Sequence, residues 1–191
     1  MVDRRIQKTK KAITESFMDL IMEKKGPKIT ITDIASNANI DRKTFYLHYE
    51  SIDSVFKEIA KDKISEIIII LEKNNYFENL MDFKRILNAL NTVLLKDIEF
   101  YKKIASSSEY HLFWKQLEDL IKETIIEIYL KFTNLSKEEL IVFSNFYSAG
   151  IISIYISWLN NQYSKNITEI GAIIGEIIFE GFKEKLIVSV Q

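Results

Sequence analysis

The sequence predicts an all-α protein with a small N-terminal helix-turn-helix domain and a larger helical domain behind it. Only one proline and five glycines occur in 191 residues, too few for a strand-and-turn protein, which needs turn residues roughly every 8–12 positions. Apolar residues recur at helical spacing along nearly the whole chain. We therefore expect a three-helix helix-turn-helix domain over residues 1–50 and a second domain over residues 51–191, in which residues 51–74 form the connecting helix.

The first helix is predicted over residues 4–25. Ile13, Phe17 and Ile21 fall on one of its faces, and Gly26-Pro27 supplies a stop signal. Residues 1–11 carry a local charge of +4, although the whole chain has a net charge of −1. Two interpretations of this basic segment are open: a surface that meets phosphate, or an ordinary solvated helix face.

Two short helices joined by a tight turn follow. Thr30-x-x-Asp33 has the spacing of a capping box and predicts a helix over residues 31–37. The turn contains Asn39, one of the few residue types besides glycine that enter left-handed backbone conformations at modest cost. Asp41 is a predicted cap for the second short helix, over residues 42–48. This arrangement is a helix-turn-helix, whose second helix fits the major groove of DNA.

The second short helix is rich in hydrogen-bond donors. Its polar positions are Arg42, Lys43, Thr44, Tyr46 and His48. These side chains suit phosphate oxygens and base edges. The alternative is a surface helical hairpin whose tyrosine and histidine only pack against neighbours.

The stretch from Ile29 to Tyr49, ITITDIASNANIDRKTFYLHY, resembles the DNA-binding signature of the TetR (tetracycline-repressor-like) family. The Asp-Ile-Ala and Thr-Phe-Tyr-x-His-Tyr pieces carry the resemblance, which covers about residues 8–60. Beyond it, the chain is similar to the family in architecture, an all-helical and sequence-divergent regulatory domain. The segment from Phe146 to Trp158, with Gly150 and a late tryptophan, also resembles a subgroup of the family.

The resemblance implies a role for each matching residue. It implies phosphate contacts from Thr30, Thr44, Tyr46 and His48, and contacts to bases or adjacent phosphates from Arg42 and Lys43. Two positions depart from the family pattern: the usual turn glycine is Asn39, and a lysine common at the start of the fourth helix is Ile52. One phosphate contact is therefore expected to be missing. We expect Arg4 and Arg5 to compensate at the backbone or the adjacent minor groove.

The rest of the chain predicts a series of longer helices. Ser51 can cap the connecting helix. Further helices are expected at about residues 82–95, 97–106, 110–132, 137–162 and 167–186. The two around Asp97 form either separate helices or one kinked helix.

An uncharged segment marks the expected subunit interface. Residues 140–164 contain no charged side chain, and a helix that is apolar nearly all round is buried on several sides or embedded in a membrane. With one such segment and no basic flank, we expect no membrane span. A helix-turn-helix protein reads paired half-sites of a palindromic operator as a twofold dimer. The predicted homodimer interface comprises Ile151, Tyr155, Trp158, Gly171 and Gly175; the alternative is that this surface is all internal core.

Aromatic residues of the second domain are candidates for lining a ligand cavity. They are Phe83, Tyr101, Phe113, Trp114, Phe146, Tyr147 and Tyr155. Such residues suit an unidentified small hydrophobic or aromatic ligand, although aromatic side chains at helical spacing also form plain core.

The composition argues against catalysis. The chain has no cysteine and two histidines, neither of which belongs to a Glu-x-x-His pair, and it lacks glycine-rich phosphate loops and dinucleotide fingerprints. We expect no enzyme activity, cofactor or metal. The sequence also shows no signal for secretion, so we expect a cytoplasmic protein.

The family resemblance implies a transcriptional repressor released from DNA by a small ligand. The alternative is a protein-binding coactivator or adaptor without such a ligand.

Overall fold

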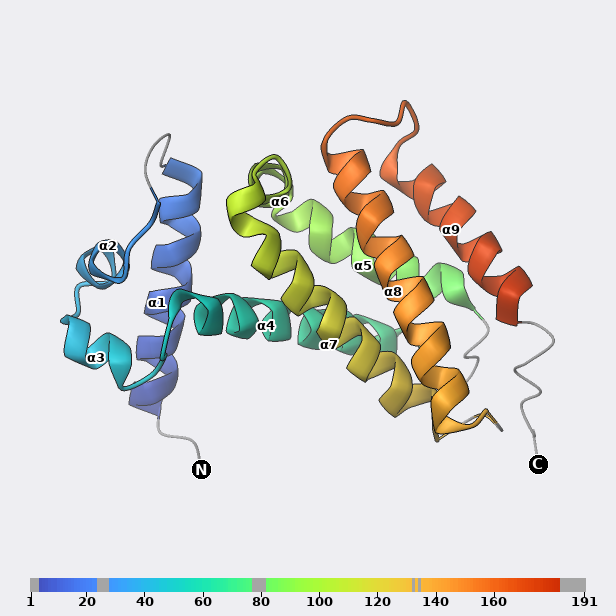
Figure 1. Ribbon diagram of the computed structural model, residues 1–191, viewed down its shortest axis with the longest axis horizontal. Coiled ribbons are helices and arrows are strands. Elements are labelled where there is room, and N and C mark those ends of the chain that lie inside the picture. The colour runs from blue at the N-terminus through green and yellow to red at the C-terminus, as the bar shows by residue number, and fades with distance from the viewer. Residues whose placement is uncertain (1–3, 24–27, 77–81, 132, 134, 183–191) are drawn as a thin grey trace.

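The computed structural model describes residues 4–23, 28–76, 82–131, 133 and 135–182. These residues form helices without any strand, which confirms the predicted all-α class (Figure 1). The helices are α1 (Arg4–Glu23), α2 (Ile31–Asn37), α3 (Arg42–Tyr46), α4 (Ile52–Lys73), α5 (Phe83–Lys96), α6 (Ile98–Ala105), α7 (His111–Tyr129), α8 (Lys137–Leu159) and α9 (Ile167–Phe182), with a 3₁₀ turn, η2 (Ser108–Tyr110), before α7.

Local capping explains where several helices begin. At α2 and α4, the predicted caps are present: the hydroxyl oxygens of Thr30 and Ser51 accept hydrogen bonds from the third amide of each helix. Ser136 and Glu139 form a third capping box at the start of α8. Each cap satisfies amides that have no partner within the helix.

Asparagines in left-handed conformations lie just beyond the ends of three helices. Asn39, Asn75 and Asn161 have φ angles of 53°, 53° and 58°. The last of these ends α8 at Leu159, three residues before the predicted end. Asp97 separates α5 from α6 with φ −123° and ψ 39°, so the region predicted as two helices or one kinked helix is two. The predicted stop at Gly26-Pro27 and the end of the last helix at residue 186 lie outside the described residues.

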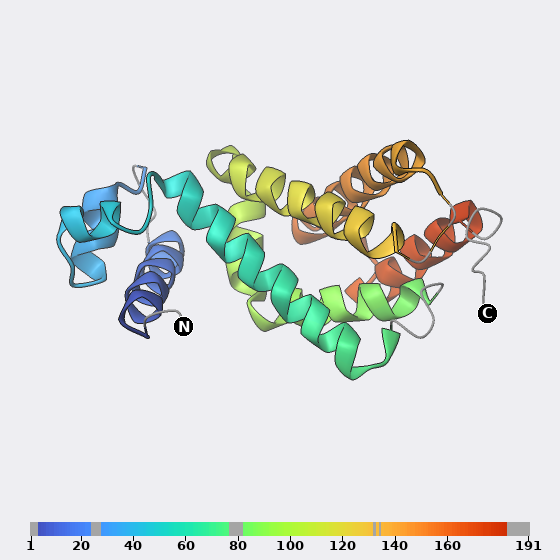
Figure 2. The same ribbon diagram turned by 90° about the horizontal axis from the view of Figure 1, so that it is seen from below.

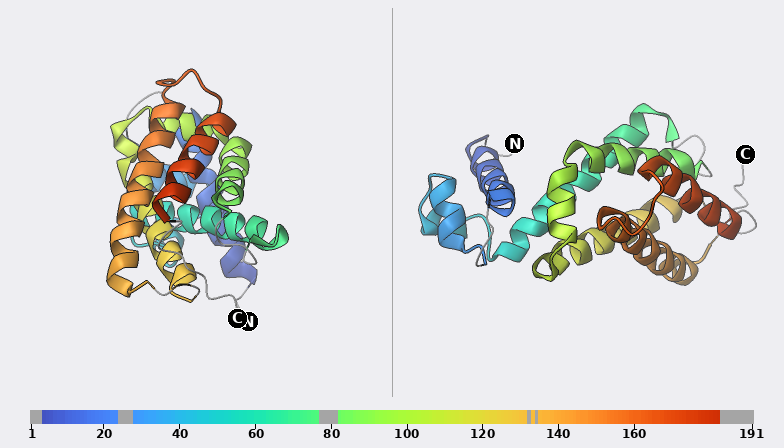
Figure 3. Two further views of the ribbon diagram at one scale, coloured as in Figure 1. Left: turned by 90° about the vertical axis from the view of Figure 1, so that its right-hand side faces the viewer. Right: turned by 90° about the horizontal axis from the view of Figure 1, so that it is seen from above.

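Helices α1–α3 form a group at one end of the elongated molecule, and α4 runs from this group into the second one (Figure 2). The sequence-predicted boundary at residue 50 falls in the connection between α3 and α4. In the second group, α4 packs against α7 and α5, α8 packs mainly on α7, and α9 packs mainly on α5. The end view shows α9 lying between α5 and α8 (Figure 3).

Aromatic contacts join the two groups at the start of α4. The rings of Phe17 and Phe56 lie 4.7 Å apart in an edge-to-face arrangement, and Phe56 also contacts Phe113 at 5.7 Å. Edge-to-face pairs are a favoured ring geometry. The core of α1–α3 is therefore continuous with that of the second group.

Candidate DNA interface and internal cavity

The group α1–α3 holds two short helices in a fixed relation. The buried hydroxyl of Ser16 on α1 donates to the Ile34 carbonyl at 3.0 Å, which ties α1 to α2. Phe45 of α3 is fully buried, and its ring contacts that of Tyr49. These contacts fix the inner face of α3, so its opposite face points away from the core.

The turn between α2 and α3 is closed by backbone hydrogen bonds. The Ile40 amide donates to the Ala35 carbonyl at 3.0 Å, across the left-handed Asn39. Asp41 then caps α3 by accepting from the Thr44 amide at 2.6 Å. This bond lowers the pKa of the Asp41 carboxyl. The predicted helix-turn-helix is thus present, with α3 ending at Tyr46 rather than at residue 48.

The predicted DNA-contacting residues lie on the outer side of this unit. Arg42, Lys43 and Tyr46 are exposed on α3, whereas Thr44 and His48 are half-buried. Thr30 is exposed at the start of α2, but its amide and its hydroxyl both donate to Asp33. A phosphate contact from Thr30 therefore requires one of these donors to be released. Arg4 and Arg5 are exposed in the first turn of α1.

An apolar cavity of about 100 Å³ lies among α4, α5 and α7. Ile67, Ile86 and Ile121 are among the aliphatic side chains that line it. Tyr76 and Tyr129 also line it, and their hydroxyl oxygens lie 2.8 Å apart, within hydrogen-bond distance. Burial is the main cause of the raised pKa of both phenols, and it raises the pKa of Tyr129 to about 12. Both are neutral at physiological pH and their hydroxyls bond to each other, so the cavity presents an almost wholly apolar, uncharged surface.

The structure separates the aromatic residues predicted to bind a ligand. Phe83 and Tyr147 line this cavity, while Tyr101, Trp114 and Tyr155 line a smaller space of about 30 Å³ beside it. The two spaces share lining residues, Ile67 and Ile121 among them.

Two members of the predicted ligand set lie elsewhere. Phe113 lines neither space, because it is enclosed by the rings of Phe56, Phe100 and Trp114. Phe146 is 70% exposed on the outer face of α8. The prediction is wrong for these two residues. Sequence reasoning also missed Tyr76, Tyr129 and the isoleucines, because aliphatic side chains on inner helix faces have the same pattern whether they fill a core or line a cavity.

Most of the predicted dimer interface faces the interior of its own chain. Tyr155 is 2% exposed and bonds to Asn91, and Ile151 lines the cavity. A Cβ atom at Gly171 would lie 3.0 Å from Asn91 Nδ2, and one at Gly175 would lie 3.2 Å from Leu87 Cδ1. The two glycines thus allow close helix approach, as predicted, but to α5 of the same chain. The interface prediction is therefore wrong for these four residues.

Trp158 is the remaining member of the predicted interface. It is half-buried, and its indole nitrogen donates to the Lys165 carbonyl at 3.0 Å.

The outer face of α8 is exposed and uncharged. It presents Val142, Phe146, Ala149, Gly150 and Ser153, and nothing lies within 4 Å of the place a Cβ atom would take on Gly150. Neighbouring α9 exposes two further apolar side chains on its outer face, Ile173 and Ile177.

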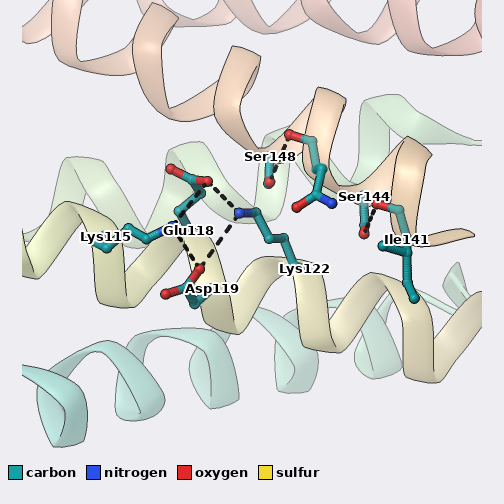
Figure 4. A network of polar contacts seen from close by, with 8 residues as sticks. Lys115, Glu118, Asp119, Lys122, Ile141, Ser144 and Ser148 are labelled. Carbon is teal, nitrogen blue, oxygen red and sulfur yellow. Dashed lines mark hydrogen bonds and ion pairs between the residues drawn. The ribbon is translucent and has the colours of Figure 1, made fainter.

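The inner face of α8 packs on α7 through small polar residues (Figure 4). Ser144 and Ser148 are buried, and their hydroxyls donate back to carbonyls of their own helix. On α7, Lys122 pairs with Glu118 at 2.6 Å. Helix α8 is long and apolar enough to cross a membrane by length and composition alone. Its inner face already has a protein partner in α7, which accounts for part of that apolar character.

Comparison with known proteins decides the family. A family model described as the TetR-type transcriptional regulator C-terminal region matches residues 81–180, more than half of the chain. The chain belongs to the TetR family of transcriptional regulators. TetR-family regulators bind DNA, are dimers and respond to small molecules, which agrees with a helix-turn-helix at one end and an internal cavity in the other group.

Two relatives in sequence match parts of the chain. An uncharacterised helix-turn-helix regulator, YxbF of Bacillus subtilis, is 37% identical over 68 residues, which are 35% of this chain and 18% of that protein. The dhaKLM operon transcriptional activator DhaS of Lactococcus lactis is 26% identical over 121 residues, or 62% of each chain. The matched segments thus span less than two thirds of these relatives.

Solved structures share the TetR fold over nearly the whole chain. The dihydroxyacetone kinase operon activator DhaS has a TM-score of 0.59 at 23% identity, covering 93% of this chain and 98% of that one. A TetR-family regulator from Syntrophomonas wolfei has a TM-score of 0.62 at 15% identity, covering 97% and 99%. No group of three metal-ligating side chains occurs among the described residues.

Proposed function

We propose that this TetR-family regulator is a cytoplasmic homodimer that binds a palindromic operator through α3. The capped helix-turn-helix with its exposed, basic α3 is the observation that carries the proposal. In this arrangement Arg42 and Lys43 contact bases or adjacent phosphates. Phosphate contacts come from Thr30, Thr44, Tyr46 and His48, with Arg4 and Arg5 reaching the flanking backbone or minor groove. Residues 1–50 bind DNA, and residues 51–191 bind the ligand and the second subunit.

DNA binding is tested with a duplex selected by the protein from a random library. We expect Lys43→Ala and Tyr46→Ala to raise the dissociation constant, measured by fluorescence anisotropy, about tenfold or more, because each removes an interaction from both half-sites. Lys131→Ala is the charge-matched control, since Lys131 follows the C-terminal end of α7, and this end lies far from α3 (Figure 1). Lys43→Ala should also lower the dependence of log Kd on log salt by about one unit for each phosphate that Lys43 neutralises in the wild type. Unchanged affinity in both variants would exclude α3 as the recognition helix.

The outer face of α8 supports the dimer. It combines exposed Val142 and Phe146 with the small residues Ala149, Gly150 and Ser153, which allow two helices to approach closely. Exposed apolar surface of this kind marks protein–protein contact. We expect Ser153→Arg to shift the protein from dimer to monomer in sedimentation velocity, because it places two charges in the interface. Glu123→Arg, on the exposed side of α7, is the control and leaves the dimer intact.

The cavity supports a small, uncharged and apolar ligand. Aliphatic and aromatic side chains surround it, and the two tyrosine hydroxyls among its lining residues bond to each other and carry no charge. Binding of such a compound favours the dimer conformation that does not fit the operator, and a preference of about 1–3 kcal/mol is enough to change operator occupancy. Filling the cavity with Ile86→Phe should abolish the response to any apolar compound that releases the wild type, while operator selection is retained.

We assign the regulator the role of a repressor, with transcriptional activation as the second candidate. The relative from Lactococcus lactis, which is named an activator, favours this second candidate role. Reconstituted transcription separates the two. A repressor lowers transcription from a promoter that overlaps the selected operator, and an apolar ligand restores it. An activator raises transcription, and an adaptor does so only with a partner protein and regardless of the ligand.

A further inference from the structure

Leu47 exposes more of its side chain than any other large hydrophobic residue in the described part of the chain. It is 73% exposed, although its neighbours Phe45 and Tyr49 are buried in the core of α1–α3. The core therefore takes the apolar side chains on either side of Leu47 and leaves this one outside.

The backbone places Leu47 on the same face as Lys43. The Leu47 amide donates to the Lys43 carbonyl at 3.1 Å, and Leu47 keeps helical angles, with φ −69° and ψ −20°. Residues four apart in a helix share one face. Leu47 thus lies about 6 Å further along the helix axis than Lys43, on the face that the proposed function places in the major groove.

A leucine on this face has few favourable contacts in the major groove. Base edges there present hydrogen-bond donors and acceptors, and the C5-methyl group of thymine is the apolar exception. Covering a donor or acceptor with leucine removes its bond to water without a replacement, which costs free energy. Covering a methyl group removes apolar surface of both partners from water, which is favourable.

We propose that Leu47 is a specificity-determining residue that packs against the C5-methyl group of a thymine in each operator half-site. The proposal rests on the proposed function, in which α3 lies in the major groove. The methyl contact adds a preference for thymine at one symmetric position of the operator. This preference is separate from the contacts proposed for Arg42, Lys43 and the phosphate-binding residues.

Uracil substitution tests the contact, because deoxyuridine differs from thymidine only by this methyl group. The probe is the duplex selected by the wild-type protein from a random library, with each thymine of the half-site replaced in turn by deoxyuridine. At one position we expect the dissociation constant of the wild type to rise about fourfold per half-site, and about fifteenfold when both are changed. Leu47→Ala should bind the thymine duplex more weakly and show no further loss with uracil at that position.

Leu95→Ala provides the matched control, since Leu95 is an exposed leucine on α5, away from α3. It should keep the full response to uracil. Thermal unfolding of Leu47→Ala at the wild-type temperature shows that the variant is folded.

Three results would overturn the proposal. The first is an operator half-site without thymine, and the second is the absence of any position where uracil weakens the wild type. The third is an equal loss from uracil in wild type and Leu47→Ala, which indicates that a residue other than Leu47 contacts the methyl group. In each of these cases a duplex is still selected, so the proposed function stands. If no duplex is selected, the proposed function and this inference both fail.

Discussion

The hydroxyl of Tyr155 donates to the side-chain oxygen of Asn91 at 2.5 Å, inside the second group of helices. Asn91 also donates to the Ile167 carbonyl at 3.3 Å. One asparagine on α5 therefore holds both α8 and the first turn of α9. Gly171, one turn further along α9, leaves room for this side chain.

Removing the Tyr155 hydroxyl should destabilise the fold. Tyr155→Phe leaves the buried Asn91 oxygen without its partner, and an unsatisfied buried acceptor costs about 1–3 kcal/mol. Urea denaturation at fixed protein concentration measures the loss. Tyr163→Phe is the control, because Tyr163 is exposed in the α8–α9 connection and should unfold like the wild type. Equal stability of the two variants would show that the bond contributes nothing.

The contrast between Asp41 and Gly171 shows what the sequence can predict. The helix-turn-helix depends on local hydrogen bonds, which join atoms no more than five residues apart. They are the caps at Thr30 and Asp41 and the backbone bonds around Asn39. The spacing of residue types is therefore enough to predict this motif. Gly171, in contrast, leaves space for the side chain of Asn91, which is remote in sequence. Periodicity tells which residues share a helix face, but it does not tell which neighbour that face meets.

Helix α8 shows the same limit at the candidate interface. From Leu140 onward both of its faces are uncharged, so the pattern of residues does not indicate which one faces the core. The structure places Tyr155 inside, which contradicts its predicted place in the dimer interface, and Phe146 outside, which contradicts its predicted place in the ligand cavity. The cavity escapes prediction for a related reason, since it is a space left between side chains of ordinary core type.

The ion pair between Lys63 and Asp97 should contribute more than exposed pairs do. Its atoms lie 2.5 Å apart with the side chains 13% and 30% exposed, and it joins α4 to the break between α5 and α6. A double-mutant cycle with Lys63→Gln and Asp97→Asn should give a coupling above about 1 kcal/mol.

The exposed pair Lys11–Glu15 on α1 is the comparison. Its coupling should stay below about 0.5 kcal/mol, because water and salt screen it. Similar coupling energies in both cycles would contradict a special role of Lys63 and Asp97 in holding α4.

The cap at Asp41 should control the position of α3. Asp41→Ala removes the acceptor for the Thr44 amide, so we expect weaker operator binding and a less stable protein. Asp41→Asn keeps an acceptor at the cap and should restore most of both losses. An Asp41→Ala variant with wild-type operator affinity would mean that packing of Phe45 alone positions the helix.

The same cap predicts a response to acid. The bond from Thr44 lowers the pKa of Asp41 below 3.8 in the folded protein. Its stabilising contribution is therefore present above that pH and is lost as the pH falls through the folded-state value. Asp41→Asn has no carboxyl to protonate, so between pH 5 and 3 its melting temperature should fall less than that of the wild type.

The phenol pair that lines the cavity should contribute to the loss of stability at alkaline pH. Burial raises the pKa of Tyr129 from 10.0 to about 12 and raises that of Tyr76 as well. A folded-state pKa above the unfolded value means that the contribution is complete below pH 10 and is lost as the pH rises toward about 12. The melting temperature of the wild type should fall more steeply over this range than that of Tyr129→Phe, which has one ionisable phenol fewer in the buried pair. Tyr163→Phe, which removes an exposed phenol, should follow the wild type.

Tyrosinate absorbance gives a second readout, because the buried phenols should ionise only as the protein unfolds. Parallel melting curves for all three proteins would place Tyr129 in contact with water and would remove the argument that the cavity accepts only uncharged ligands.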